Sequence, residues 1–126
     1  MKAKKPIDDN PKTAFGMRKP TAAFIPPVSF LHLGRAMEYG ADKYGPFNWR
    51  DRAVSSTVYY GGMDRHQKSW FDGETIDPES GVHHLGMIMA NCAILLDAEA
   101  QGNLIDDRPK PGTYAKLLRE LTRHDD

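Results

Sequence analysis

Four stretches of the chain carry apolar residues at the spacing of a helix. The first is predicted from about Ser29 to Tyr39 and ends near Gly40, because glycine favours helix termini. Its apolar side consists of Leu31, Leu33, Ala36 and Met37. The second begins at a run of candidate caps, Ser55, Ser56 and Thr57. One face of this second helix then carries Tyr59, Met63, His66 and Trp70, at spacings of four, three and four.

The third helix has the clearest limits. Asp77 is a candidate N-cap, Pro78 suits the first helical position, and Gly102 is a suitable terminator. Between these limits, a wide apolar stripe consists of Leu85, Ile88, Met89, Cys92, Leu95 and Leu96. The fourth helix is predicted from Thr113 to about Arg123, and its apolar side consists of Leu117, Leu118 and Leu121.

This pattern predicts an all-α fold. No stretch alternates apolar and polar residues with period two between turn signals, so no strand is expected. The architecture that follows is a small helical bundle of about four helices, formed by a single domain over residues 28–126. Residues 1–27 are expected to be an extended arm, because they contain Pro6, Pro11, Pro20, Pro26 and Pro27.

Composition and charge exclude several classes of function. Seventeen basic residues balance seventeen acidic ones, so no nucleic-acid-binding or membrane-binding surface is expected. The single cysteine cannot form an intrachain disulfide, and no apolar stretch follows the basic start. These features favour a soluble, cytoplasmic protein. So small a bundle also leaves apolar helix sides exposed, which predicts a homodimer or a higher homo-oligomer.

Acidic residues and histidines gather in WFDGETIDPESGVHH, residues 70–84. Asp77 and Glu79 have a complete structural explanation as a cap and a first-turn residue. His84 is nevertheless expected to approach His66, because antiparallel packing of the second and third helices brings the two together. Imidazoles and carboxylates that converge at one end of a bundle can bind a divalent cation. The sequence contains no HExxH motif, CxxC pair or P-loop, so spacing alone does not single out one metal.

A second unusual stretch is GADKYGPFNWR, residues 40–50, which we expect to be a structured loop because Gly40, Gly45 and Pro46 break helices. Its aromatic side chains can stack on a nucleobase while its cations pair with phosphates. The alternative is that the aromatics cover the end of the bundle and the cations stay in water. Arg65 can likewise bind a phosphate or form an ion pair.

Taken in order, GADKYGPFNWR, RHQKSW and DGETIDPESGVHHLGMIMAN resemble the phage-associated dATP/dGTP diphosphohydrolase domain family. That family's pattern reads roughly G-A-x-K-Y-x-x-x-N-W-R, then R-H-x-x-x-W, then G-E-x-x-D-x-E-S-G-x-x-H-L. The resemblance extends from about residue 20 to residue 97. The matching residues are Lys43, Tyr44, Asn48, Trp49, Arg50, Arg65, His66, Trp70, Gly73, Glu74, Asp77, Glu79, Ser80, Gly81 and His84.

The resemblance implies a relation to the all-α, MazG-like nucleotide pyrophosphohydrolases, which are usually oligomeric and use Mg²⁺ or Mn²⁺. The implied reaction splits a purine dNTP into its monophosphate and pyrophosphate. The residues then expected to bind the metal are His66, Glu74, Asp77, Glu79 and His84. The catalytic carboxylates, one of which activates water, are expected to be Glu74, Asp77 and Glu79. The residues expected to bind the substrate are Lys43, Tyr44, Asn48, Trp49, Arg50 and Arg65.

Two departures from related sequences keep other functions open. The MazG-like motifs EExxE and ExxD are absent from the sequence, and Met87 stands where many relatives have a second histidine. A phage protein that binds or sequesters nucleotides without hydrolysing them fits these departures. A structural or interaction protein, in which the acidic stretch only caps helices, is the third hypothesis.

Overall fold

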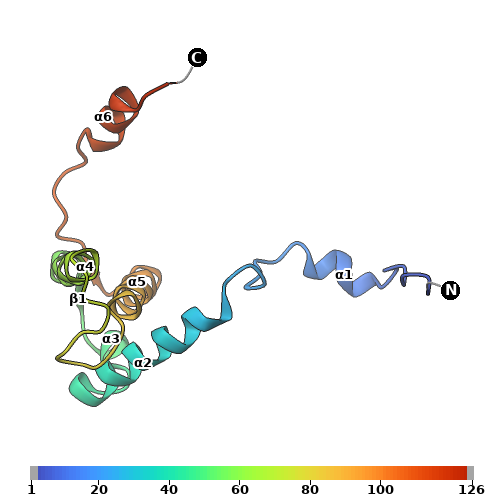
Figure 1. The fold of residues 1–126 in the computed structure, drawn as a ribbon, viewed down its shortest axis with the longest axis horizontal. Helices are drawn as coiled ribbons and strands as arrows, with labels where there is room; N and C mark the ends of the chain where they lie inside the picture. Colours follow the sequence, from blue (N-terminus) through green and yellow to red (C-terminus); the bar gives the residue numbers. More distant parts are fainter. Residues whose placement is uncertain (1–2, 125–126) are drawn as a thin grey trace.

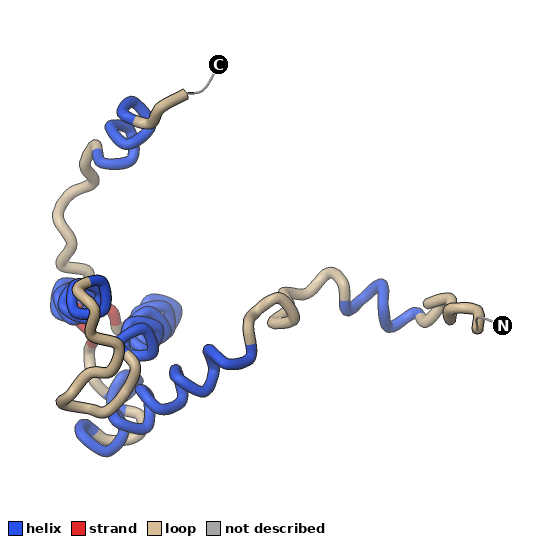
Figure 2. The backbone as a smooth tube through the Cα atoms, viewed as in Figure 1, coloured by secondary structure: helices blue, strands red, loops and turns tan. Residues whose placement is uncertain are grey.

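Helix α5, His84–Gln101, lies at the centre of the structure. The computed structural model describes residues 3–124 and is shown in Figure 1. Helix α2, Pro27–Tyr44, and helix α4, Ser56–Phe71, both pack against α5. The short helix α3, Asn48–Asp51, also contacts α5. Helices dominate the chain in Figure 2, and this confirms the all-α prediction.

Two very short strands tie the start of α4 to the end of α5. Strand β1, Val54–Ser55, pairs in parallel with β2, Leu104–Ile105, and both are red in Figure 2. The sequence did not indicate these strands, because two residues are too few to show an alternation. Since β1 precedes α4 and β2 follows α5, the two helices run antiparallel.

Helix α2 is longer than the sequence predicted. The predicted end near Gly40 is wrong, and the helix continues to Tyr44 and stops at Gly45. A glycine inside a helix costs only about 1 kcal/mol, so Gly40 alone does not end one. Gly45 does, because its φ of 101° lies in the region that favours glycine. The first part of the 40–50 stretch is therefore helix, not loop.

Helix α5 begins later than the sequence predicted. Asp77 and Pro78 were expected to start it, but the first helical residue is His84. Gly81 has a φ of 72°, which interrupts the helical path. The N-cap is His83, whose ring accepts a hydrogen bond from the backbone N–H of the second residue of the helix at 3.0 Å.

Residues 72–83 form an ordered loop between α4 and α5, which we call the acidic loop. Ile76 and His83 pair across it in an antiparallel bridge. The carboxylate of Asp77 caps a turn inside the loop, where it accepts from the backbone of Glu79 at 3.1 Å and the hydroxyl of Ser80 at 3.2 Å. Asp77 therefore does cap a backbone N–H, although the turn it caps is not the start of a helix.

Small residues allow the helices of the body to approach closely. The core cluster consists of Ala36, Val82 and Ala90. At the crossing of α2 and α5, a Cβ added to Gly86 would lie only 2.7 Å from the carbonyl oxygen of His32. The two helix backbones are thus in contact at this point.

Both ends of the chain extend away from the body in Figure 1. Helix α1, Pro11–Gly16, interrupts the arm that the sequence predicted to be wholly extended, because Asn10 caps it and Pro11 starts it. Helix α6, Tyr114–Leu121, confirms the fourth predicted helix but stands apart from the others. The bundle therefore contains three long helices. Within residues 3–124, no helix is both long enough and apolar enough to cross a membrane.

Candidate functional site

A cavity of about 750 Å³ lies between α2, α3, α4, α5 and the acidic loop. Its lining includes every residue that the sequence placed in the site except Arg50. These lining residues are Lys43, Tyr44, Asn48, Trp49, Arg65, His66, Glu74, Asp77, Glu79 and His84. Residues from both unusual stretches of the sequence therefore meet around one space.

The imidazole rings of His66 and His84 face each other inside this cavity. Their Nδ1 atoms are 2.8 Å apart, which confirms that antiparallel packing brings the two histidines together. His84 is only 3% exposed, and its Nε2 lies 2.7 Å from a carboxylate oxygen of Glu74. Because a carboxylate accepts, His84 donates from Nε2. In the neutral ring its Nδ1 lone pair then points towards His66.

His66 is held in its neutral form. Burial lowers the pKa of its ring below the ordinary 6.5. The carboxylate of Asp77 opposes this shift, whereas His84 and Arg65 add to it when they are charged. At pH 7 the ring is therefore uncharged, and one of its nitrogens carries a free lone pair.

The carboxylate of Glu79 ties the acidic loop to α2. One of its oxygens accepts from Lys43 Nζ at 3.2 Å and from the hydroxyl of Tyr39 at 3.4 Å. The hydrogen bond to Glu79 is the main reason that the pKa of Lys43 is raised. Tyr39 was not expected in the site, although a helix that continues through Gly40 places it one turn from Lys43.

The two ends of the cavity differ in character. The histidine pair and the carboxylates form a charged end. Tyr59 lies seven residues before His66 on α4, and Asn91 lies seven residues after His84 on α5. Both residues also line the cavity. Since a helix rises 1.5 Å per residue, they lie about 10 Å from the histidines along antiparallel axes.

Aromatic and amide groups define this second end, to which α3 contributes Asn48 and Trp49. Burial raises the pKa of Tyr59, so its phenol is neutral at pH 7. The sequence analysis did not assign Tyr59 to the site. Its spacing from His66 on one helix face was the signal that indicated it.

Arg50 lies outside the lining of the cavity. Its guanidinium forms two hydrogen bonds with Asp97 on α5, at 2.6 and 3.0 Å, and it also lies 5.1 Å from the ring of Trp49. The sequence placed Arg50 on the phosphates of a substrate. In the structure it instead fixes α3, and with it Trp49, against α5.

Imidazole nitrogens suit transition metals such as Zn²⁺, Fe²⁺ and Ni²⁺, whereas the carboxylates around the histidine pair also suit Mg²⁺ and Mn²⁺. Glu74 is placed behind His84, as carboxylates commonly are behind metal-binding histidines. Within residues 3–124, no three His, Cys, Asp or Glu side chains are grouped closely enough to hold an ion by themselves. His66 and His84 could therefore hold an ion only together with further ligands, from water or from substrate phosphates.

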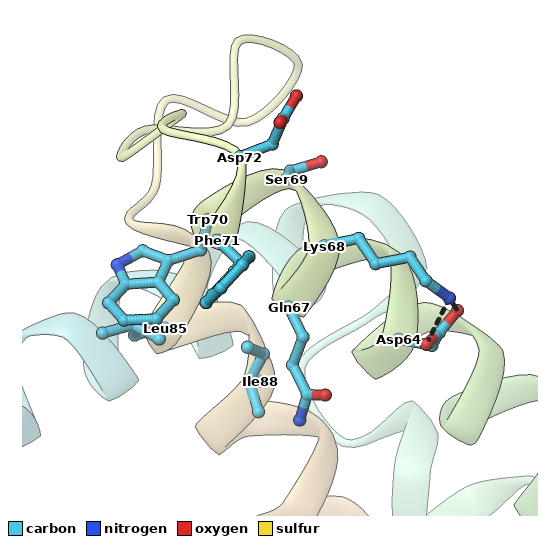
Figure 3. A pocket seen from close by; sticks show the side chains of 9 residues that line it. All are labelled: Asp64, Gln67, Lys68, Ser69, Trp70, Phe71, Asp72, Leu85 and Ile88. Atoms are coloured by element: carbon cyan, nitrogen blue, oxygen red, sulfur yellow. Dashed lines mark hydrogen bonds and ion pairs between the residues drawn. The ribbon is translucent and has the colours of Figure 1, made fainter.

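A second, more open cavity of about 960 Å³ lies at the end of α4 (Figure 3). Its apolar lining consists of Trp70, Phe71, Leu85 and Ile88. Three charged residues also line it, and two of them, Asp64 and Lys68, pair with each other at 2.6 Å, whereas the third is Asp72. No histidine lines it, so the chemistry expected from the sequence belongs to the first cavity.

The region that forms this cavity matches a known protein family. A family model described as dATP/dGTP diphosphohydrolase, N-terminal, matches residues 9–108. The chain belongs to this family. The matched region includes the whole cavity and ends before α6. Neither a search of curated proteins nor a search of solved structures found a match. The family's name points to a diphosphohydrolase with a nucleotide substrate, and the relation to MazG-like enzymes stays a prediction.

Proposed function

We propose that the protein is a metal-dependent hydrolase that converts a purine dNTP into its monophosphate and pyrophosphate. The observation that carries this proposal is the single cavity with two unlike ends. Histidines and carboxylates gather at one end, and aromatic and amide side chains gather about 10 Å away. A nucleotide has the same division between its phosphates and its base.

Two cations at the cavity are suited to bind the phosphates. The Arg65 guanidinium lies beside Gly61 and Gly62, near the Asn91 amide, and it has no carboxylate partner within residues 3–124. Lys43 is paired with Glu79, but both side chains are largely exposed, so the pair is weak and can be exchanged for a phosphate. The base would stack on Trp49 or Tyr44, which line the same cavity.

In the proposed reaction, a water oxygen attacks the α-phosphorus. The bond from that phosphorus to the oxygen bridging the β-phosphate breaks, and its electron pair leaves with pyrophosphate. Glu79 is the best placed of the three catalytic candidates to accept the proton from water. Glu74 is engaged by His84 and Asp77 by the turn, whereas Glu79 is released when Lys43 moves to a phosphate.

His66 and His84 would hold Mg²⁺ or Mn²⁺, with Asp77 and Glu79 as further ligand candidates. When bound, such an ion neutralises phosphate charge and lowers the pKa of the attacking water. Glu74 would act through His84, by fixing which ring nitrogen carries the proton.

The test is pyrophosphate release from dATP and dGTP with Mn²⁺ or Mg²⁺. We expect turnover that a chelator abolishes. We expect Glu79→Gln to reduce the turnover rate by about a hundredfold or more while the nucleotide still binds. Glu120→Gln on α6, outside the cavity, is the matched control. No turnover of any nucleotide with any divalent ion would falsify the proposal.

Nucleotide-binding measurements distinguish the two alternative functions. Tight binding with the nucleotide recovered intact indicates a sequestering protein. Unchanged nucleotide affinity in both Glu74→Gln and His84→Ala indicates a structural or interaction protein whose acidic loop only caps its own backbone.

A further inference from the structure

We propose that Asn91 reads the Watson–Crick edge of the purine base, and that rotation of its amide lets one site accept both adenine and guanine. This inference rests on the proposed function, because it assumes that the cavity binds a purine nucleotide. Asn91 lies on α5, is half-buried, and lines the cavity. Its spacing of seven residues from His84 places it on the same flank of the helix, but the sequence indicated no role for it.

Asn91 lies away from the histidine pair, at the end of the cavity that contains Tyr59. It lies two helical turns beyond His84, or about 10 Å along α5. Tyr59, Trp49 and Ile94 line the same cavity, and the Arg65 guanidinium lies near the Asn91 amide, because both approach Gly62. Beside these groups, an amide can pair with the polar edge of a stacked base.

The amide of Asn91 is free to bind a ligand. Within residues 3–124 it hydrogen-bonds to no protein group, and its atoms are not sealed from solvent. Asn103 provides the contrast, because its amide donates to the backbone carbonyls of Trp49 and Arg52 at 3.2 and 3.0 Å. One asparagine is thus used to hold the fold, whereas the other presents its amide to the cavity.

The facing helix leaves room for this amide. A Cβ added at Gly62 on α4 would lie 3.4 Å from Asn91 Nδ2 and 4.0 Å from a guanidinium nitrogen of Arg65, at the close limit of ordinary van der Waals contact. A larger side chain at Gly62 would therefore restrict both groups. This gives a reason for a glycine at a helix position where alanine is about 1 kcal/mol better.

An asparagine amide matches both purines because it carries a donor and an acceptor side by side. Adenine presents N1 as an acceptor beside its amino donor. Guanine presents N1–H as a donor beside O6 as an acceptor. Turning the amide by 180° exchanges its own donor and acceptor, so the same side chain fits either edge.

The decisive variant is Asn91→Asp, which keeps the shape but offers only acceptors. A carboxylate matches the N1–H and amino donors of guanine, but it meets N1 of adenine as one acceptor facing another. We expect the ratio of dATP to dGTP dissociation constants to rise by about tenfold or more. The ratio is measured by calorimetry with Mn²⁺ in the Glu79→Gln background, so that neither nucleotide is consumed.

Two further variants complete the test. Gln101→Glu introduces the same charge on the same helix outside the cavity, and it should leave the ratio unchanged. If Asn91→Asp does not fold, Gly62→Ala replaces it, and its methyl group should weaken both nucleotides severalfold. An unaltered ratio in a folded Asn91→Asp, or unaltered affinities in Gly62→Ala, overturns the inference. If neither the wild-type protein nor the Glu79→Gln variant binds either nucleotide, the proposed function itself fails.

Discussion

Single residues in the cavity depend on partners that fix their orientation. The ring of His84 is set by Glu74 on one side and by His66 on the other, at 2.7 and 2.8 Å. Since His84 is almost fully buried, its ring has no water with which to exchange these bonds. Loss of Glu74 would therefore leave the His84 ring without the partner that orients it, and would alter the cavity through that ring.

The lowered pKa of His66 predicts how stability depends on pH. The unfolded chain binds a proton at this ring more readily than the folded protein does. The contribution of the neutral ring to stability is complete above about pH 6.5, and it is lost as the pH falls from there through the lowered pKa. We expect His66→Gln to flatten the fall in Tm between about pH 7 and pH 5. His124→Gln, near the exposed C-terminal end, is the control, and an identical slope in wild type and His66→Gln contradicts the prediction.

At the scale of elements, α4 begins in an unexpected way. The sequence offered Ser55, Ser56 and Thr57 as caps, but Ser55 makes no side-chain cap bond. The cap is instead the carboxylate of Asp107, which accepts from the hydroxyl of Ser56 at 2.7 Å and from the backbone and hydroxyl of Thr57 at 2.8 and 2.6 Å. The chain after β2 thus closes the start of α4.

Asp107→Asn should lower Tm at pH 7, because the negative charge at the start of α4 is lost. The hydrogen bonds, chiefly that from the Thr57 hydroxyl, lower the pKa of Asp107 to about 2. Its contribution to stability is therefore present above the ordinary value of 3.8 and disappears as the pH falls towards about 2. Thermal unfolding measured across pH should therefore show that the Tm of the variant falls less steeply in acid than that of the wild type. The control is Asp9→Asn on the N-terminal arm, which should change neither the Tm at pH 7 nor the fall of Tm in acid.

The crossing of α2 and α5 allows a direct test of packing. Gly86→Ala should destabilise the protein by about 1–3 kcal/mol, because its methyl group would clash with the backbone of His32. Gly34→Ala is the matched control, since a Cβ at Gly34 would meet nothing within 4 Å. That variant should gain up to about 1 kcal/mol from helix propensity. Urea unfolding measures both, and equal stability of the two variants would argue against the close crossing.

At the scale of the whole molecule, much apolar surface is uncovered. Phe24, Phe71 and Tyr114 are 92%, 87% and 80% exposed. Val54 is the largest side chain that is fully buried within residues 3–124. So small a core gives little hydrophobic stabilisation to a chain of this length. Exposed apolar side chains of this kind, at the end of α4 and on α6, are the basis on which we predict a homo-oligomer.

We accordingly expect sedimentation equilibrium to give a mass of at least twice that of the monomer at micromolar protein. The Tm should also rise with protein concentration, because association stabilises the folded state. A monomeric mass together with a Tm independent of concentration would contradict the prediction.

Much of the cavity was visible in the sequence. The four-three-four spacing of the second helix placed Tyr59, His66 and Trp70 on one face, and periodicity of this kind depends only on helix geometry. Trp70 nevertheless lines the other cavity, because it lies one turn beyond His66, where the helix leaves the first cavity. Asn91 shares a helix flank with His84 by the same spacing, but a single polar residue there has many ordinary explanations, so the sequence indicated no role for it.

The sequence by itself determined the helical class and the meeting of His66 with His84, because helix periodicity and short connections are local properties of the chain. Only the tertiary structure decided the start of α5, the pairing of Arg50 with Asp97 and the capping of α4 by Asp107. In the last two, the partners are 47 to 51 positions apart in the chain. No local pattern specifies such pairs, because their contact depends on how the helices and loops between them fold together.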